Sequence, residues 1–298
     1  MYRGLNVGVA IPALNEEASI GLVVGDLRSL HNVDDTPVID DVVVCDNGSS
    51  DATAARASEA GARIAQEDRR GYGSACLAAI AKLRRTDVVL FTDADHAFHA
   101  SQATRLLDRI AEGADLVIGS RAWGHRDPGA LSPTQVMGNR LATVLIRFLW
   151  GPRVTDLGPY RAIRSEALSA LGMRDPAFGW TVEMQVKAIQ HGLEVVEVPV
   201  DTRVRIGKSK ISGTVRGVLG AGFGILSMIA KLRWQQRERR TAGDGLVPSR
   251  RALGARSRVR ALRTRSEVLP HSRSVGPETR GITTDDHTGR PDTTWPRG

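Results

Sequence analysis

The sequence has little cysteine. Cys45 and Cys76 are the two cysteines among 298 residues, and they form neither a CxxC pair nor a zinc-ligand spacing. This scarcity argues against a disulfide scaffold and against a cysteine-based zinc site, and a chain of this length can bury its core without such cross-links. The N-terminal residues MYRGLNVGVA are unlike a secretory signal, so we expect buried thiols in a reducing, cytoplasmic compartment.

The sequence also lacks an apolar run long enough to cross a membrane, which takes about 20 residues. The candidate run, Gly217–Ala230, has 14 residues and lies between Arg216 and Lys231. We expect residues 213–240 to form an apolar and basic interfacial helix, which would make the protein peripheral on the inner face of the membrane. The alternative is a core helix that docks on the folded domain.

Positive charge is concentrated after residue 202. Residues 1–202 contain 20 Lys and Arg against 26 Asp and Glu, whereas residues 203–240 contain 10 against 1. A basic block beside an apolar run favours an anionic surface such as membrane headgroups. Nucleic acid fits poorly, because the basic residues lie outside the predicted domain and lack interleaved aromatic residues. Residues 241–298 are rich in Arg, Ser, Gly, Thr and Pro, and we expect a disordered basic tail there.

Short apolar runs alternate with helical patterns through the first 120 residues. Runs such as VVVC and VVLF are apolar on both faces, as strands of a covered parallel sheet must be. We therefore predict one α/β domain at residues 5–212 with a mostly parallel central sheet. The predicted strands are 7–11, 41–44, 63–65, 88–92, 116–119, 160–163 and 194–198, and the predicted helices are 18–30, 51–60, 73–83, 101–111, 134–150, 165–171 and 180–191.

Polar side chains follow the ends of the predicted strands, where ligands bind in open parallel sheets. Asp93 and Asp95 come directly after the strand at 88–92. Two carboxylates so close together repel each other and require a nearby cation. Oxygen ligands of this kind suit Mg²⁺ or Mn²⁺ that bridges a diphosphate. The sequence therefore predicts a metal and nucleotide site at this edge of the sheet.

Seven short motifs occur along the chain: IPALNEE, VVVCDNGSSDAT, GYGSACLAAI, FTDADHA, IGSR, VTDLGPYRAI and RVRIGKSKISGT. In this order they resemble the family 2 glycosyltransferases of the GT-A fold, and within that family the polyprenyl-phosphate sugar synthases. The resemblance covers residues 5–212. It implies metal-assisted, inverting transfer of a sugar from a nucleotide-diphosphate sugar to a polyprenyl phosphate.

The resemblance assigns donor-binding roles to residues at the strand ends. It implies that Asp95 ligates Mg²⁺ or Mn²⁺ directly, and that Asp93 contacts the ribose or a metal-bound water. Gly71 and Gly73 either let the backbone approach the donor or form a plain loop. His96 stands where the family often has glycine, and is an extra metal ligand or a packed side chain. The other implied donor residues are Pro12, Asn15 and Glu17 under the nucleotide, with Glu17 near the ribose, and Asp46 at the base.

A phosphate acceptor needs cations rather than a general base, because a phosphate monoester has a second pKa of about 6 and is already anionic. Arginine suits bidentate contact with phosphate. In the family the Arg203–Lys210 segment lies over the phosphates, so Arg203 is also a candidate catalytic residue. Glu183 is a candidate base or orienting group, or else part of a helix surface. The candidate cations are Arg121, Arg140, Arg203, Arg205 and Lys208, and the resemblance implies that Asp156 and Arg161 also lie near the acceptor.

Other functions would suit parts of the same pattern. A glycosyltransferase could act on a soluble or a different lipid acceptor. A nucleotidyltransferase would carry a Gly-rich loop with Arg and Lys after the first strand, where this chain has PALNEE. The intact pair of Asp93 and Asp95 argues against a nucleotide-sugar-binding protein without catalysis. The prediction is thus a hexosyltransferase whose partners are a nucleotide-sugar, a lipid phosphate and an anionic membrane surface, and not nucleic acid.

Overall fold

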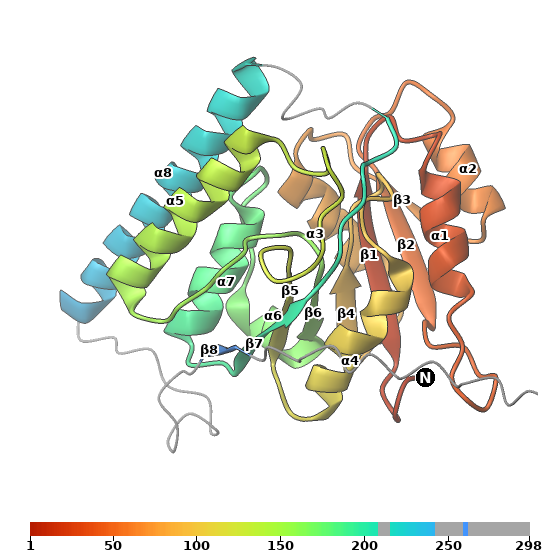
Figure 1. Ribbon diagram of the computed structural model, residues 1–298, viewed down its shortest axis with the longest axis horizontal. Helices are drawn as coiled ribbons and strands as arrows, with labels where there is room; N and C mark the ends of the chain where they lie inside the picture. Colours follow the sequence, from red (N-terminus) through yellow and green to blue (C-terminus); the bar gives the residue numbers. More distant parts are fainter. Residues whose placement is uncertain (208–214, 242–258, 262–298) are drawn as a thin grey trace, which may run out of the picture. The chain divides into compact units, whose positions relative to one another are not determined.

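The computed structural model describes residues 1–207, 215–241 and 259–261. Within these residues the centre is an eight-stranded sheet with the order β3-β2-β1-β4-β6-β5-β7-β8 (Figure 1). All seven predicted strands are confirmed, because each overlaps one of the strands β1 to β7. The strands are β1 (Val7–Ala13), β2 (Asp41–Asp46), β3 (Arg63–Gln66), β4 (Val88–Phe91), β5 (Leu116–Ser120), β6 (Arg161–Arg164), β7 (Val195–Pro199) and β8 (Val259–Ala261).

One strand of the described sheet runs against the others. β6 is antiparallel to β4 and β5, whereas the pairs of β1 with β2 and β4, of β2 with β3, and of β7 with β5 and β8 are parallel. The predicted mostly parallel sheet is therefore confirmed, and the reversal of β6 was not part of the prediction. The loops after β1, β2, β4, β5 and β7 consequently emerge at one edge. Arg161, the first residue of β6, lies at the same edge opposite Phe91 and Ile118.

Helices cover both faces of the sheet because alternate strand residues point to opposite sides. Val9 and Ile11 of β1 pack in one core cluster with α1 and α4, whereas Ala10 packs in a second cluster with α3, α6 and α7. Cys45 and Cys76 are buried free thiols in the second cluster, as predicted. The helices are α1 (Ile20–Arg28), α2 (Thr53–Glu59), α3 (Tyr72–Lys82), α4 (Ala103–Ala111), α5 (Pro133–Trp150), α6 (Ser165–Leu171), α7 (Trp180–Gln190) and α8 (Val215–Thr241).

The long helices α5 and α8 lie side by side next to α7 (Figure 1). α5 begins with a capping box, in which Ser132 and Gln135 exchange side-chain and backbone hydrogen bonds. Met228, Ile229 and Leu232 of α8 are buried against α5 and α7 in a third core cluster. This face of α8 therefore docks on the folded domain, whereas Phe223, Leu226 and Trp234 are exposed, and the predicted interfacial role of the helix stays a prediction. No helix among the described residues has both the length and the apolarity needed to cross a membrane.

The predicted tail from residue 241 contributes one strand that the sequence pattern did not indicate. β8 pairs in parallel with β7, and its three residues, Val259, Arg260 and Ala261, lie opposite Val195, Val196 and Glu197. The strand is short and contains an arginine between two apolar residues, so it carries no periodic signal of its own. The remainder of the predicted disordered tail lies outside the described residues.

Gly73 in the first turn of α3 lies against backbone, and this contact gives a stability test. A Cβ at Gly73 would be 1.9 Å from the carbonyl oxygen of Asp175. Gly73→Ala should therefore push α3 away from that loop and lower the free energy of unfolding by about 1–3 kcal/mol. Gly25 of α1 has open space around its Cβ position. Gly25→Ala is the matched control and should stabilise the protein by up to about 1 kcal/mol.

Thermal unfolding measures the stability of both variants. For a domain of this size, a change of about 1 kcal/mol in the free energy of unfolding should shift the melting temperature by about 2–4 °C. The Gly73 and Gly25 variants should shift the melting temperature in opposite directions. A Gly73→Ala protein as stable as the Gly25→Ala protein would contradict the close packing of α3 on the Asp175 loop.

Candidate active site

The loops after β1 and β2 are joined by hydrogen bonds at the carboxyl edge of the sheet. Asn15 has a φ of 52°, a left-handed conformation that asparagine tolerates better than most residues. Its N–H donates to Ser49 Oγ at 2.9 Å, and its Oδ1 accepts the Ser50 N–H at 2.8 Å. Asp46 Oδ1 accepts the Ser49 N–H at 3.0 Å. These contacts bring the predicted donor residues Asn15 and Asp46 onto adjoining loops.

Glu17 and Pro12, which were also predicted under the nucleotide, have structural contacts of their own. Glu17 Oε2 accepts the N–H of Ala52 at 2.9 Å, directly before α2. It thus supplies one of the acceptors that the free N–H groups of a helix start require. Pro12 lies within β1 opposite Cys45 of β2. Both residues belong to the same edge as Asn15, and their contact with a nucleotide stays a prediction.

Gly71 and Gly73 lie where two backbone segments approach closely. A Cβ at Gly71 would be 2.1 Å from the carbonyl oxygen of Pro176, and the Gly73 position is equally crowded by Asp175. Gly71 also has a φ of 148°, which favours glycine. This packing accounts for both glycines, and their predicted contact with the donor stays a prediction. The hydroxyl of Tyr72, which lies between the two glycines, donates a hydrogen bond at 3.2 Å to the carboxylate of Asp93, which follows β4.

Asp93 and Asp95 lie in the loop after β4. Burial and the neighbouring charge of Asp95 raise the pKa of Asp93 to about 7. Asp95 is buried, its Oδ1 accepts the Ala97 N–H at 3.0 Å, and its Oδ2 lies 2.7 Å from Nη2 of Arg205. The buried Asp95 and the partly buried Asp93 lie two residues apart and need compensating positive charge, and Arg205 supplies part of it.

The acidic pair fits a divalent cation that is shared with a substrate. Among the residues that the structure describes, no group of three or more His, Cys, Asp and Glu side chains could hold a metal alone. Mg²⁺ commonly takes one or two protein carboxylates and completes its shell with substrate phosphates and water. Asp93 and Asp95 therefore fit a metal–diphosphate complex better than a metal centre built from protein alone.

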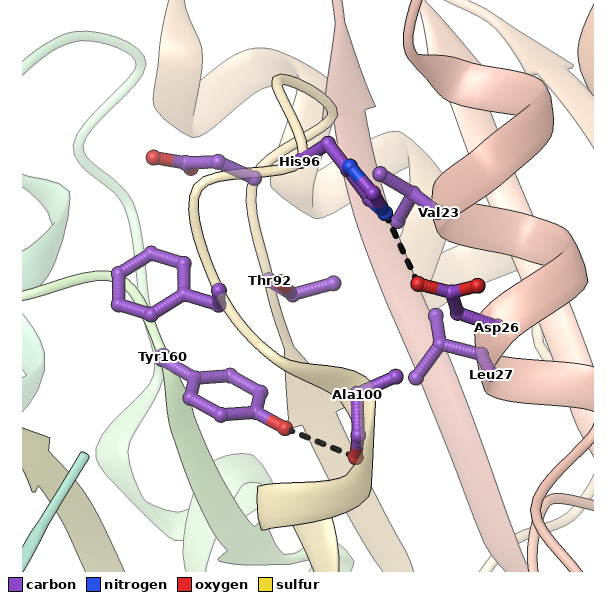
Figure 2. Close-up of a pocket in the computed structure, with 9 residues that line it drawn as sticks. Val23, Asp26, Leu27, Thr92, His96, Ala100 and Tyr160 are labelled. Carbon is purple, nitrogen blue, oxygen red and sulfur yellow. Dashed lines mark hydrogen bonds and ion pairs between the residues drawn. The ribbon is translucent and has the colours of Figure 1, made fainter. Parts of the chain in front are cut away.

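His96 is turned toward Asp26 of α1 (Figure 2). Its Nε2 lies 2.8 Å from Oδ2 of Asp26, as the dashed line in Figure 2 marks, and 2.6 Å from Nη2 of Arg203. Arg203 also donates from Nε to the His96 carbonyl at 2.7 Å. The cavity that His96 and Asp26 share with Thr92 and Tyr160 measures about 10 Å³, room for about one water molecule. His96 is therefore a packed side chain here, the second of the two predicted alternatives.

Arg121, after β5, is held by an ion pair with Asp156. Its Nε and Nη2 lie 2.8 Å and 2.6 Å from the two carboxylate oxygens, and its N–H donates to Oδ2 at 2.7 Å. Burial alone would raise the pKa of Asp156, but the Arg121 guanidinium holds that pKa below its usual range. Burial alone would lower the pKa of Arg121, but the charge and hydrogen bonds of Asp156, and to a smaller extent the charges of Asp93 and Asp95, raise it. The structure thus brings two predicted acceptor residues close to the acidic pair.

Glu197 fixes the loop that carries Asp156, and sequence reasoning missed it. It is buried in β7, and its Oε1 accepts the N–H and the hydroxyl of Thr155 at 2.9 and 3.1 Å and the Asp156 N–H at 3.2 Å. Burial raises the pKa of Glu197 to about 7. The available signal was a single carboxylate inside the apolar run VVEVP, because a buried charge requires partners.

For four further candidates, the described residues show no contact with Asp93 or Asp95. Arg161 is buried, donates only to backbone carbonyls, and has its pKa lowered by burial to about 10. Glu183 accepts two backbone N–H groups of the loop before α7 and pairs with Lys187 at 2.7 Å. Arg140 is exposed on α5. Lys208 lies outside the described residues. The predicted roles of these four residues stay predictions.

Comparisons with known proteins agree with this arrangement. Residues 8–172, which include the acidic pair and Arg121, match the family described as glycosyl transferase family 2. An uncharacterized glycosyltransferase of Mycobacterium tuberculosis is 36% identical over 71% of this chain and 92% of that protein. The undecaprenyl-phosphate mannosyltransferase of Micrococcus luteus is 32% identical over 72% and 90%. The crystal structure of M. tuberculosis glucosyl-3-phosphoglycerate synthase with phosphoglyceric acid has a TM-score of 0.60 and 25% identity, over 76% of this chain and 81% of that chain.

Glu197 gives a stability test of the loop that holds Arg121. Glu197→Gln should lower the free energy of unfolding only a little, because an amide carbonyl in place of Oε1 can still accept the hydrogen bonds from Thr155 and Asp156. Glu197→Met has similar volume but no comparable acceptor, and should cost about 1–3 kcal/mol for each N–H left buried and unpaired. Urea unfolding measures the difference. Equal stability of the Gln and Met variants would contradict the assigned hydrogen bonds.

The same residue predicts a pH dependence. Burial raises the pKa of Glu197 from 4.5 to about 7 in the folded protein, which therefore binds this proton more tightly than the unfolded chain does. The resulting stabilisation is complete below pH 4.5 and is lost as the pH rises to about 7. The stability of the wild type relative to Glu197→Gln should accordingly fall across this window. A difference that does not change with pH would count against the buried carboxylate.

Proposed function

Because this chain belongs to glycosyl transferase family 2, we propose that it transfers a sugar, with inversion, from a nucleotide-diphosphate sugar to a polyprenyl phosphate. One observation carries the proposal: the molecule combines an acidic pair beside a fixed arginine with exposed apolar faces on α5 and α8. The first feature suits chemistry between phosphates, and the second suits a substrate carried in lipid.

The donor site in this proposal is the carboxyl edge around the loops after β1, β2 and β4. Asp46 accepts the N–H of the base, and Asn15 and Glu17 line the adjoining loop. Asp95 and Asp93 hold Mg²⁺ or Mn²⁺ against the donor diphosphate. The cation, when bound, neutralises the diphosphate and makes it a better leaving group. The firm position of Asp95, whose Oδ1 is fixed by the Ala97 N–H, supports its role as the direct ligand.

The acceptor phosphate binds at Arg121, which Asp156 holds in a fixed orientation. A phosphate is already anionic near neutral pH and needs no general base, since its second pKa is about 6. It needs positive charge that aims it at the sugar, and a guanidinium can contact two of its oxygens. The engagement of Glu183 with backbone N–H groups and Lys187 supports an acceptor that does not depend on this residue as a base.

The membrane side of the proposal rests on the outer faces of α5 and α8. Met137, Leu141, Val144 and Phe148 are exposed at intervals of four, three and four residues, which places them on one face of α5. α8 adds exposed Phe223, Leu226 and Trp234, with Phe148 and Phe223 83% and 76% exposed. Monomeric proteins seldom expose so many large apolar side chains on adjacent helices without a binding role.

Basic side chains on the same helices suit an anionic membrane. Arg140 and Arg147 of α5 and Lys231 and Arg237 of α8 are exposed. A helix pair with apolar and cationic side chains of this kind lies in the headgroup region, where each basic residue contributes about 1 kcal/mol. We place the protein peripherally on the cytoplasmic face of the membrane, in line with its two free buried thiols.

The relatives support a phosphorylated acceptor. The M. luteus protein, 32% identical, is named for transfer to undecaprenyl phosphate. The solved glucosyl-3-phosphoglycerate synthase, 25% identical, is bound to phosphoglyceric acid, a soluble phosphorylated molecule. Both names describe a phosphorylated acceptor, and the exposed faces of α5 and α8 favour the lipid form for this chain.

If Asp95 ligates the metal, its replacement by asparagine should cause a large loss of transfer activity. Asp95→Asn keeps the side-chain size but removes an anionic metal ligand, so transfer should fall by about 100-fold or more, as when a group that stabilises transition-state charge is removed. Asp68→Asn, at an exposed position outside the acidic pair, is the control and should retain wild-type turnover. Full turnover by Asp95→Asn, or by the wild type in excess EDTA, would refute the metal assignment.

The membrane assignment predicts that exposed residues of α5 are needed for vesicle binding. The wild type should sediment with vesicles that contain anionic lipid, less strongly at high salt. Leu141→Asp with Phe148→Asp should abolish this binding and transfer to polyprenyl phosphate while sparing slow hydrolysis of the donor. Val33→Asp, at an exposed apolar residue in the loop after α1, is the control and should still bind. A wild type that ignores vesicles at low salt, or prefers a soluble phosphorylated acceptor such as 3-phosphoglycerate, would defeat the assignment.

A further inference from the structure

Asp95 already carries a positive partner, the guanidinium of Arg205. Arg205 Nη2 lies 2.7 Å from Asp95 Oδ2, and 29% of the Arg205 side chain and 5% of the Asp95 side chain are exposed. The other oxygen, Oδ1, accepts the Ala97 N–H at 3.0 Å. Both oxygens of the carboxylate that would ligate the metal are therefore engaged by the protein itself.

The backbone around Arg205 is paired with the loop that carries Asp95. The Ile206 N–H donates to the Asp95 carbonyl at 2.9 Å, and the Arg203 N–H donates at 3.0 Å to the carbonyl two residues further on. Arg203 is anchored separately by its side chain, which lies 3.5 Å from Asp26. Because these anchors do not involve the Arg205 guanidinium, that side chain can leave Asp95 while the backbone keeps its place.

A guanidinium and a divalent cation compete for the same oxygen of Asp95. Both need close contact with Oδ2, and their like charges repel strongly in a partly buried site. A nucleotide diphosphate changes this balance in two ways. Its oxygens complete the coordination of the metal, and they also offer Arg205 a bidentate anionic partner.

We propose that Arg205 occupies the metal position at Asp95 in the donor-free protein, and moves onto the donor diphosphate when metal and nucleotide bind together. The proposal rests on the proposed function, because it takes the donor to be a nucleotide diphosphate. Metal and nucleotide then promote each other's binding by the same factor, as linkage requires. Arg205 thereby differs from Arg121, which Asp156 holds in place throughout.

Mn²⁺ binding to the full-length, nucleotide-free protein tests the first half of the exchange. Arg205→Gln removes the resident charge, so the acidic pair should bind Mn²⁺ roughly two- to fivefold more tightly in an electron paramagnetic resonance titration, the size expected of a partly exposed ion pair. Arg205→Lys keeps a charge without the planar fork and should lie between the two. Arg105→Gln is the matched control, since it breaks another arginine–aspartate pair, 3.9 Å from Asp201, and should bind Mn²⁺ like the wild type.

Titration with UDP and GDP tests the second half. In the wild type, the nucleotide that binds should tighten Mn²⁺ binding, and this factor should shrink in Arg205→Gln because no resident cation needs to be drawn away. Weaker or unchanged binding of Mn²⁺ alone by a folded Arg205→Gln protein would overturn the proposal, because Arg205 would then not oppose the metal. If that variant does not fold, the same result for Arg205→Lys overturns it. Failure of both nucleotides to bind the wild type refutes the donor assignment, while the Mn²⁺ comparison still decides the role of Arg205.

Discussion

The repulsion between the Asp93 and Asp95 carboxylates, two residues apart at the end of a buried strand, governs the groups around them. Tyr72 of α3 donates its hydroxyl to Asp93, and Arg205 pairs with Asp95. Arg121, held after β5, adds a positive charge whose field reaches both carboxylates. Each contact joins segments far apart in the sequence, so the packing of the domain and the charge balance of the site arise together. A divalent cation with a diphosphate is the ligand that fits this balance.

β7 and the chain that follows it determine the positions of the two arginines of the site, Arg121 and Arg205. Glu197 within β7 fixes the loop of Asp156, which in turn holds Arg121. The chain that leaves β7 carries Arg205 to Asp95. One cation is therefore fixed by a buried ion pair, and in our proposal the other is exchangeable. Such a division suits a transfer between two phosphates, in which an acceptor must be oriented before the reaction and a diphosphate must be stabilised as it leaves.

The sequence predicted the strands, the helices and the polar strand ends well because these depend on local patterns: apolar runs, helical periodicity and spacing. The reversed direction of β6 depends on how α5 and the loop after it return the chain, so the residues of β6 could not reveal it. Glu197 was missed for a similar reason, since its role depends on partners distant in the sequence. Arg205 was a candidate cation, but its pairing with Asp95 could not be read from a local pattern either. Glu183 was predicted near the acceptor, and its contacts with the loop before α7 were equally invisible to a local pattern.

The most direct test of the whole account is to identify the product that the purified protein makes. The protein would be incubated with Mn²⁺, anionic vesicles containing polyprenyl phosphate, and labelled nucleotide-sugars one at a time. The account predicts that one donor yields a label that partitions into organic solvent as a single sugar joined to the lipid phosphate, with its anomeric configuration inverted. A labelled product that stays in water, or a lipid product with retained configuration, would contradict it.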